Sequence, residues 1–425
     1  MPLGSPVLDE RRARTAPERR LSPRTRVAVA LARAAAGVSR RTGLGAGGVI
    51  GGRIAAALDP EVLRHLGRDR TVVLVTGTNG KTTTASMLTR VLEPLGPVAA
   101  NSDGANMPDG VIAALVDRPD APFAVLEVDE NYVAEVAQRL RPACLVLLNL
   151  SRDQLDRVGE VRSVERALRE AVSGLPGMAV VAGCDDPLAA SAALASARPV
   201  WVSTGGSWTA DALACGRCGR PIHHDGPAWR CRCGLARPRP DWVLAGDRAV
   251  DAAGRTVPLE LRLPGRANAA NATMAVAAAA LLGVDPRAAG ARLATISEVA
   301  GRYRRTTLGG HPVRVLLAKN PAGWRETLPL LEPGSPVVIA VNGREADGRD
   351  LSWLWDVPFE VLRGRPVVAA GERSADLAVR LTYADVPHVR CPDPVHAVAG
   401  LPPGSVELVA NYTAFRQLGR RSGDG

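Results

Sequence analysis

The sequence predicts an α/β protein with a central parallel sheet, joined to a smaller α/β domain at its C-terminal end. Short runs rich in Val, Leu and Ala alternate with helix-like segments, and only 3% of the 425 residues are aromatic, which disfavours an all-β sandwich. A Gly-rich turn carrying a lysine follows one of these runs, and a second alternating stretch begins near residue 300. This alternation indicates doubly wound parallel strands that bind ligands at their carboxyl ends.

The net charge of +10 is concentrated at the N-terminal end of the chain. Residues 1–41 contain ten arginines against Asp9, Glu10 and Glu18, which places +7 there and leaves the remainder nearly balanced. We expect residues 1–24, rich in Pro and Arg without periodicity, to form a disordered basic arm. The balanced remainder argues against a body that binds nucleic acid.

No stretch is long and apolar enough to span a bilayer, and the apolar run 27–38 follows a long charged lead. We therefore expect a cytoplasmic protein, with a peripheral position at the inner face of the membrane left open. The seven cysteines are then expected to be thiols or metal ligands and not a disulfide framework.

Residues 24–41 predict a basic helix in which Val27, Leu31 and Val38 stand among alanines. Two interpretations are open. The helix packs on the next domain, which we favour, or it touches anionic lipid. A Gly-rich connection, residues 43–52, follows it.

The centre of the prediction is the stretch 71–84, TVVLVTGTNGKTTT. Its apolar run 72–75 predicts a buried parallel strand, and the turn after it has the form Gly-x-x-Gly-Lys-Thr-Thr. Glycines let backbone N–H groups approach phosphate oxygens, a lysine reaches the β- and γ-phosphates, and a threonine hydroxyl binds Mg²⁺. The predicted ATP-binding residues of this loop are Gly77, Thr78, Asn79, Gly80, Lys81, Thr82 and Thr83.

The lysine content supports this assignment. The chain is rich in Arg but has only two lysines, Lys81 and Lys319. Where arginine occupies nearly every basic position, a remaining lysine indicates a need for a compact ammonium group. A chance Gly-Lys-Thr in a turn is the alternative, and the agreement of strand, loop, Lys and Thr disfavours it.

The next two predicted strands, residues 123–129 and 143–150, also end in polar side chains. Glu127 and Asp129 close the first, where a carboxylate can hold Mg²⁺ against ATP phosphates, and we favour Glu127 with Thr82 as the ligands. For Asp153 and Asp156, which follow the second, helix capping is a serious alternative. Shorter strands are predicted at 178–182 and 199–202.

An inserted module, residues 205–242, interrupts the alternation with four cysteines. Their spacing, CxxC and then CxC a dozen residues later, suits tetrahedral Zn²⁺, whereas a lone CxxC would leave a redox pair open. The histidines at 223 and 224 are alternative ligands, although we prefer them as plain loop residues. The predicted ligands of this closed, structural site are Cys215, Cys218, Cys231 and Cys233.

Two asparagines stand at the start of a predicted helix within residues 261–282. Asn268 and Asn271 are three apart, so they present two amides to one ligand, and we assign them to ATP binding. Helix N-capping is the alternative, and it explains one asparagine but not both.

A smaller α/β domain is predicted for residues 301–425, after a polar hinge at 298–306. Its strands are expected at 313–317, 337–341, 367–370 and 406–410. An acidic, Gly-bearing loop ends at Asp350 and is followed by Trp353 and Trp355. Exposed tryptophans beside such a loop suggest a site or a partner surface.

Residues 76–83, Glu127 and residues 265–271 resemble the Mur ligase superfamily, the ATP-dependent amide-forming enzymes of cell-wall and folate synthesis. The closer likeness is to the ligase-like subunits of lipid II isoglutaminyl synthases. It rests on residues 104–107, 152–156 with 159–160, the four cysteines, 319–323, and 346–350 with 352–353. The resemblance implies a Mur ligase-type ATP-binding domain over residues 25–300, with the zinc ribbon inserted in it.

The resemblance also implies a reaction and its partners. ATP would phosphorylate the α-carboxylate of D-glutamate in lipid II, and ammonia would convert the acyl phosphate to D-isoglutamine. The ammonia would come from a GatD-type glutamine amidotransferase in a heterodimer, with Asp350 supplying the acid for that partner's catalytic histidine. ATP, Mg²⁺ and structural Zn²⁺ are the implied cofactors, and lipid II at the membrane surface is the implied substrate.

Two departures from the family pattern bear on the alternatives. Gln154 stands where the classical members have His, and the chain has no lysine between Lys81 and Lys319 that a carbamate would need. A stand-alone Mur or folylpolyglutamate-type amino-acid ligase is the second candidate, and the missing lysine and the four-cysteine insertion disfavour it. A zinc-ribbon nucleic-acid NTPase is the third, disfavoured by the nearly neutral body and the few aromatic residues.

Overall fold

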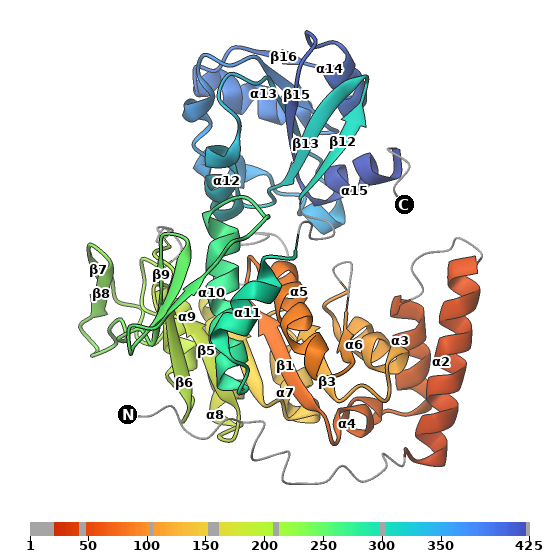
Figure 1. Cartoon of the computed structure of the whole chain (residues 1–425). Helices are drawn as coiled ribbons and strands as arrows, with labels where there is room; N and C mark the ends of the chain where they lie inside the picture. The colour runs from red at the N-terminus through yellow and green to blue at the C-terminus, as the bar shows by residue number, and fades with distance from the viewer. Residues whose placement is uncertain are drawn as a thin grey trace. The chain divides into compact units, whose positions relative to one another are not determined.

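The structure is a computed structural model that describes residues 21–41, 48–101, 105–151, 161–206, 212–296 and 303–421. These form two units (Figure 1). Unit 1 holds the described residues up to 262 together with 267–296, and unit 2 holds residues 263–266 and 303–421. Of the predicted basic arm 1–24, only residues 21–24 are described. Residues 152–160, which include Asp153, Gln154 and Asp156, also lie outside the described part of the chain.

Unit 1 is built on a nine-stranded sheet in the order β11-β10-β9-β6-β5-β4-β1-β3-β2. The strands from β9 to β2 are parallel, while β10 and β11 extend the edge in antiparallel pairing. Their bounds are β1 Thr71–Thr76, β2 Val98–Ala100, β3 Phe123–Glu127, β4 Cys144–Leu147, β5 Ala179–Gly183, β6 Pro199–Ser203, β9 Trp242–Ala245, β10 Arg248–Asp251 and β11 Thr256–Pro258. The five predicted strands of this region are thereby confirmed, with ends shifted by one to three residues.

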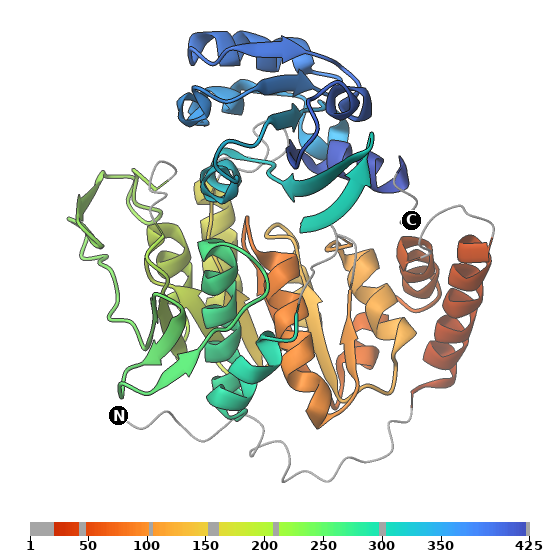
Figure 2. The ribbon, with the colours of Figure 1, turned by 45° about the horizontal axis from the view of Figure 1, so that its top comes forward.

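Helices cover both faces of this sheet, as a doubly wound fold requires. Figures 1 and 2 show α5, α10 and α11 in front of the sheet, while α4, α7, α8 and α9 contact one another in series. The helices of unit 1 are α2 Pro23–Arg41, α3 Gly48–Leu58, α4 Val62–Gly67, α5 Lys81–Leu92, α6 Pro108–Asp117, α7 Val133–Leu140, α8 Val161–Ser173, α9 Pro187–Ala193, α10 Arg266–Leu281 and α11 Pro286–Leu293, with the short 3₁₀ helix η1 Glu93–Leu95. The central strands β1, β3, β4 and β5 are buried at every position, because helices lie on both sides.

The basic helix predicted at residues 24–41 is α2, and it packs against α3 and α6. Ala28, Val29 and Ala32 are buried, whereas Val27, Leu31 and Val38 point away from the unit and are exposed. Within the described ranges no helix combines the length and the hydropathy needed to cross a bilayer.

Unit 2 has a six-stranded sheet in the order β12-β13-β17-β14-β15-β16, parallel except for β12. The strands are β12 Tyr303–Leu308, β13 His311–Leu317, β14 Val337–Ala340, β15 Val367–Ala370, β16 His388–Arg390 and β17 Val406–Ala410. The helices are α12 Pro321–Thr327, α13 Ser374–Tyr383, α14 Pro394–Ala399 and α15 Tyr412–Arg421, with 3₁₀ helices η2 Leu328–Leu330, η3 Glu345–Asp347, η4 Ser352–Asp356 and η5 Phe359–Leu362.

The four strands predicted for this unit are confirmed, and the predicted hinge 298–306 is wrong from residue 303 onward. There β12 forms a hairpin with β13 across the turn at Gly309 and Gly310. Residues 297–302 lie outside the described part of the chain. In the core, Trp324 meets Phe359 edge to face, with ring centroids 5.2 Å apart.

Candidate functional site

The loop between β1 and α5 can be built only with glycine at two positions. Gly77 has φ +131° and Gly80 has φ +91°. A Cβ at Gly77 would come within 3.0 Å of the Asn149 backbone, and a Cβ at Gly80 would lie 2.4 Å from Asn271 Oδ1. The loop is therefore held close to two neighbouring segments by the absence of side chains, and it leads directly into the first turn of α5.

Residues after β4 brace this loop from one side. The Asn79 N–H donates to Asn149 Oδ1 at 3.0 Å, and Asn149 Nδ2 donates back to the Asn79 carbonyl at 3.0 Å. The Thr78 hydroxyl donates to the Ser151 carbonyl at 3.0 Å and accepts the Ser151 N–H at 2.9 Å. Four hydrogen bonds thus fix the loop before any ligand arrives, which lowers the ordering cost of binding.

Lys81 is buried and points back under the loop. Its Nζ donates to the Gly77 carbonyl at 2.7 Å and to Glu130 Oε2 at 3.0 Å, and both side chains of this ion pair are at most 10% exposed. An ammonium held beside a helix N-terminus attracts anions. Glu130 is a partner of Lys81 that sequence reasoning did not assign.

Thr82 and Glu127 meet as expected of magnesium ligands. The Thr82 hydroxyl donates to Glu127 Oε2 at 2.8 Å, and Asn106 Nδ2 donates to the other carboxylate oxygen at 3.3 Å. The backbone at Glu127 is held by Asn101, which accepts its N–H at 2.8 Å and donates to its carbonyl at 2.7 Å. A hydroxyl and a carboxylate this close fit two adjacent positions around Mg²⁺ at about 2.1 Å each.

The two asparagines predicted to bind ATP lie inside α10, which begins at Arg266. The N-capping alternative is therefore wrong for both Asn268 and Asn271. Asn271 touches the phosphate loop at Gly80, so the structure brings it to the predicted site. Asn268 stands one turn earlier on the same helix face, because residues three apart are neighbours on a helix.

The site stands at a reversal of strand order. β1 has β3 on one side and β4 on the other, and the chain passes from β1 through β2 and β3 before it crosses to β4. Open α/β sheets bind their ligands at such switch points, outside the carboxyl ends of the strands. The switch point brings together a phosphate loop, a buried lysine and a carboxylate–hydroxyl pair. This arrangement can hold a nucleoside triphosphate with Mg²⁺.

The four predicted zinc ligands form one cluster, with all four sulfur atoms within 4.8 Å of one another. Cys215 and Cys233 Sγ are 3.7 Å apart, and Cys218 and Cys231 Sγ are 3.4 Å apart. Four thiolates around Zn²⁺ at about 2.3 Å lie about 3.8 Å from one another, so the cluster fits the ion. Burial raises the pKa of the Cys215 thiol to about 12, whereas the Leu235 N–H lowers that of Cys233 to about 7.

The cysteine module packs against the rest of unit 1. Trp229 Nε1 donates to the Cys184 carbonyl at 3.0 Å, and Arg217 Nε donates to Ser191 Oγ at 3.2 Å. A Cβ at Gly216 would lie 3.0 Å from the buried carboxyl carbon of Glu165 on α8. These contacts indicate a structural module. His223 and His224 are not loop residues as predicted but exposed positions of β7 Ile222–Asp225, which pairs with β8 Ala228–Cys231.

In unit 2 the Asp350 carboxylate is exposed and accepts the Ser352 N–H at 2.8 Å. That bond holds the pKa of Asp350 below its usual value. Asp350 is not the N-cap of the 3₁₀ helix η4, because that position is Leu351 and has no side-chain cap bond. The contact with Ser352 is a local turn that leaves the Asp350 charge at the surface. Trp355 is exposed as expected, but Trp353 is buried in the core of unit 2, so its predicted role as a surface anchor is wrong.

The other polar residues singled out near this loop have structural partners. Asp347 is the other acid that could serve a partner's histidine in place of Asp350, but it is buried, and its two carboxylate oxygens accept the N–H and the hydroxyl of Thr413. Lys319 follows β13, directly before Asn320, which caps α12 by accepting the Gly323 N–H at 2.9 Å.

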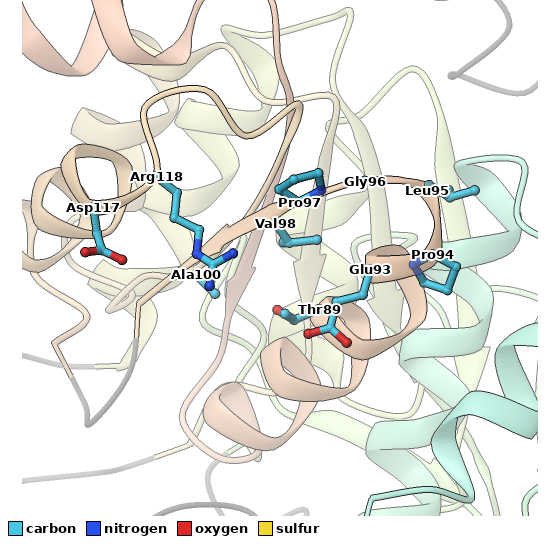
Figure 3. Close-up of a pocket in the computed structure, with 10 residues that line it drawn as sticks. All are labelled: Thr89, Glu93, Pro94, Leu95, Gly96, Pro97, Val98, Ala100, Asp117 and Arg118. Carbon is cyan, nitrogen blue, oxygen red and sulfur yellow. The ribbon is translucent and has the colours of Figure 1, made fainter.

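A hollow of about 600 Å³ lies at the far end of α5 from the phosphate loop (Figure 3). Thr89 and Glu93 line it from the end of α5 and η1, and Asp117 and Arg118 line it from the end of α6. None of the predicted site residues reaches it, and we do not assign the reaction to it.

Sequence reasoning missed two groups beside the loop, Asn149 and Glu130. Asn149 lies at the end of the predicted strand 143–150, and its reciprocal bonds with Asn79 depend on the pairing of β1 with β4. Glu130 lies three residues past the assigned magnesium carboxylate, in a turn rather than on the strand. The burial of Lys81, which the sequence does not reveal, is what requires a partner for its charge.

The chain matches two protein families, one described as "Mur ligase middle domain" over residues 75–223 and one described as "MurT ligase C-terminal" over residues 317–415. The MurT subunit of the glutamine-hydrolysing lipid II isoglutaminyl synthase of Staphylococcus aureus is 29% identical over 385 residues, covering 84% of this chain and 88% of that protein. The UDP-N-acetylmuramoylalanine–D-glutamate ligase of Bordetella parapertussis is 30% identical over 371 residues, covering 82% of this chain and 70% of that ligase.

Among solved structures, a pseudomurein peptide ligase type C from Methanothermus fervidus has this fold, with a TM-score of 0.65 and 20% identity over 86% of this chain and 80% of that chain. The doubly wound sheet, the phosphate loop at its switch point and these relatives together define an ATP-dependent ligase. The chain belongs to the Mur ligase family. The resemblance read from residues 76–83, Glu127 and residues 265–271 is thereby confirmed.

Proposed function

We propose that the chain is the ligase subunit of a glutamine-dependent synthase that amidates the D-glutamate α-carboxylate of lipid II in peptidoglycan synthesis. The observation that carries this proposal is the span of the MurT likeness. The Staphylococcus aureus relative, whose name includes lipid II isoglutaminyl synthase, is matched over 84% of the chain, and the "MurT ligase C-terminal" match falls entirely in unit 2. The Bordetella parapertussis ligase is matched over 82% of the chain, so a C-terminal domain as such does not distinguish the two candidates, and it is the "MurT ligase C-terminal" description of unit 2 that favours the amidating subunit.

In the first step a carboxylate oxygen of the substrate attacks the γ-phosphorus of ATP, and the bond to the β-phosphate oxygen breaks. Lys81 and the backbone N–H groups of the phosphate loop hold the phosphates and compensate the charge that moves onto ADP. Thr82 and Glu127 would hold Mg²⁺, which neutralises phosphate charge when bound. Asn271 lies against the loop, where it and Asn268 would orient the nucleotide.

In the second step ammonia attacks the carbonyl carbon of the acyl phosphate, and inorganic phosphate leaves. Phosphate is a far better leaving group than oxide, which is why the first step spends ATP. The ammonia comes from a GatD-type glutaminase subunit bound to this chain as a heterodimer. Such a glutaminase uses a cysteine nucleophile and a histidine base, and the base needs a carboxylate to hold its tautomer.

We assign that carboxylate to Asp350. Its exposure and its low pKa keep a negative charge at the surface, where a partner's histidine can reach it. Trp355, which is exposed and stacks edge to face with Tyr383 at 5.3 Å, provides an apolar anchor in the same unit. Asp347, by contrast, is occupied by Thr413.

The experiment combines the chain with a GatD-type subunit, ATP, Mg²⁺, glutamine and lipid II, and analyses the lipid by mass spectrometry. We expect replacement of one carboxyl by a carboxamide, with free ammonium able to replace glutamine. Tandem fragmentation places the carboxamide on the D-glutamate. ADP formation with an added amino acid and no carboxamide would establish the stand-alone ligase instead.

A further inference from the structure

The outward face of α2 is apolar, although the helix already buries another apolar side. Val27, Leu31 and Val38 are 56%, 49% and 60% exposed, whereas Ala28 and Ala32 on the opposite side are fully buried. At 100° per residue, positions 27, 31, 34 and 38 fall on one stripe along about three turns. The larger apolar side chains of this stripe thus face away from unit 1.

A second helix extends this stripe at one end. Val49 and Ile50, in the first turn of α3, are 42% and 43% exposed. α3 begins soon after α2 ends and packs beside it (Figure 1). A Cβ at Gly51 would lie 3.5 Å from Ala36 Cβ, so the first turn of α3 lies beside the C-terminal half of α2. We call Val27, Leu31, Val38, Val49 and Ile50 together the α2–α3 face.

Arginines border the α2–α3 face, and α2 contains no Asp or Glu. Arg24 lies on one side of the stripe, and Arg26 and Arg33 lie on the other. Arg24 Nε donates to the Leu58 carbonyl, and Arg33 donates to the Asp117 carbonyl, so two of these side chains are held along the flanks. A guanidinium has five N–H donors, and one such bond leaves others for phosphate oxygens.

We propose that the α2–α3 face is a membrane-binding surface, with α2 lying in the plane of an anionic bilayer. A narrow apolar stripe with basic flanks and no acidic residue is the pattern of an interfacial helix. The apolar side chains enter the headgroup boundary, and the arginine heads reach phosphates beside them. The proposal does not rest on the proposed function, since it concerns phospholipid and not the reaction.

Two protein occupants fit this face less well. A second copy, packed face to face, would bring the arginine flanks of two α2 helices together without acidic residues on either helix to pair them. The N-terminal segment 1–20 carries five arginines against three acidic residues, so its net charge repels the same flanks. An anionic bilayer supplies the apolar layer and the negative charge together.

The experiment is flotation of the full-length protein with vesicles of phosphatidylcholine alone or with one third phosphatidylglycerol. We expect binding to the anionic vesicles only, weakening as salt is raised, because exposed charges are screened. Leu31→Asp with Val38→Asp should reduce the bound fraction at least tenfold. Arg26→Glu should reduce it about tenfold, since each basic residue near the surface contributes about a fivefold change and the substitution also adds repulsion.

Val361→Asp is the matched control, because Val361 is 60% exposed in unit 2, as Val38 is in unit 1. It should leave flotation unchanged, and circular dichroism should show that all variants fold. Three results would overturn the proposal: no flotation with anionic vesicles, equal flotation of the Leu31→Asp/Val38→Asp variant, or loss of binding only when the five arginines of residues 1–20 become glutamine. Dissociation of a dimer by Leu31→Asp, seen by sedimentation without any lipid binding, would assign the face to a second copy.

Discussion

The phosphate loop and the Asp350 loop both follow parallel strands, yet they are built in opposite ways. Around the phosphate loop the charged groups are buried, and each has partners inside unit 1: Lys81 meets Glu130, and Glu127 meets Thr82. At the Asp350 loop the carboxylate is exposed, and the bond that holds it comes from the backbone two residues on. Buried charges need internal partners, whereas a charge left at the surface is open to another molecule.

Because of this difference, substitutions can distinguish a site that works within the chain from one that serves a partner. Substitutions at the first should disturb the chain's own ATP chemistry whether or not a glutaminase is present. Substitutions at the second should be silent until the partner is added.

Lys81→Arg should lower ATP-dependent amidation about a thousandfold, with free ammonium as well as with glutamine, because one group that stabilises developing charge is worth about 10²–10³. The guanidinium is too broad for the space that the ammonium fills between Gly77 and Glu130. Steady-state rates measured with both nitrogen sources test this, and unchanged circular dichroism shows that the fold survives. Near-normal turnover would refute the assignment of the loop.

Asp350→Asn should lower glutamine hydrolysis by the complex about a hundredfold and leave ammonium-dependent amidation nearly unchanged. The loss is smaller than the about 10⁴-fold effect of the corresponding change in a serine protease, because a cysteine nucleophile depends less on its base. Asparagine can still accept the Ser352 N–H, so the turn is preserved. Measuring ammonia release and lipid amidation separately distinguishes the two sites.

The matched control for this variant is Asp356→Asn, a second exposed acid of the same segment. It should leave both rates unchanged. If Asp350→Asn hydrolyses glutamine at the unmodified rate, or if Asp356→Asn shows the loss instead, the in-trans role of Asp350 is wrong.

The strands and the phosphate loop could be predicted from sequence because their signals are local. Five predicted strands in unit 1 and four in unit 2 are present, and Thr82 meets Glu127 because adjacent parallel strands end at the same edge. The cysteine cluster was also predictable, since two closely spaced pairs restrict where four sulfur atoms can lie.

The prediction that Trp353 is exposed was wrong because packing against distant elements decides which side of a helix is buried. Trp353 and Trp355 look alike in sequence, but only Trp353 falls on the side of η4 that meets the core. Along α2, alanines occupy the buried side and the larger residues Val27, Leu31 and Val38 are exposed, because α3 and α6 pack against the alanine side. Close helix packing favours small residues, and no local pattern reveals which of two apolar stripes will be covered.

The purified chain should contain one Zn²⁺, and Cys218→Ser should lower the free energy of unfolding by more than about 3 kcal/mol, because a closed thiolate site contributes folding energy. Amidation per folded molecule should change less than twofold. Cys391→Ser, outside the cluster, is the control and should retain the metal. Freshly purified protein without zinc, measured by atomic emission, would contradict the structural assignment.

Each unit contains a pair of asparagines joined by two hydrogen bonds. In unit 1, Asn79 and Asn149 exchange two hydrogen bonds beside the phosphate loop. In unit 2, Asn342 and Asn411 make the same exchange, with the Asn342 N–H donating to Asn411 Oδ1 at 3.1 Å and Asn411 Nδ2 donating to the Asn342 carbonyl at 2.7 Å. The two pairs are matched in chemistry, and they differ in that one of them braces a predicted ligand site.

Asn149→Ala and Asn411→Ala should therefore cost similar stability, about 1–3 kcal/mol each, because both leave a partner's backbone groups unsatisfied. Only Asn149→Ala should raise the KM for ATP, by about tenfold, since the loop would then have to be ordered by the nucleotide. Thermal unfolding and ATP titrations of both variants give the comparison. An equal KM for the two variants would mean that the bracing of the loop is structural support alone, and that the loop's glycines and Lys81 suffice to hold the phosphates.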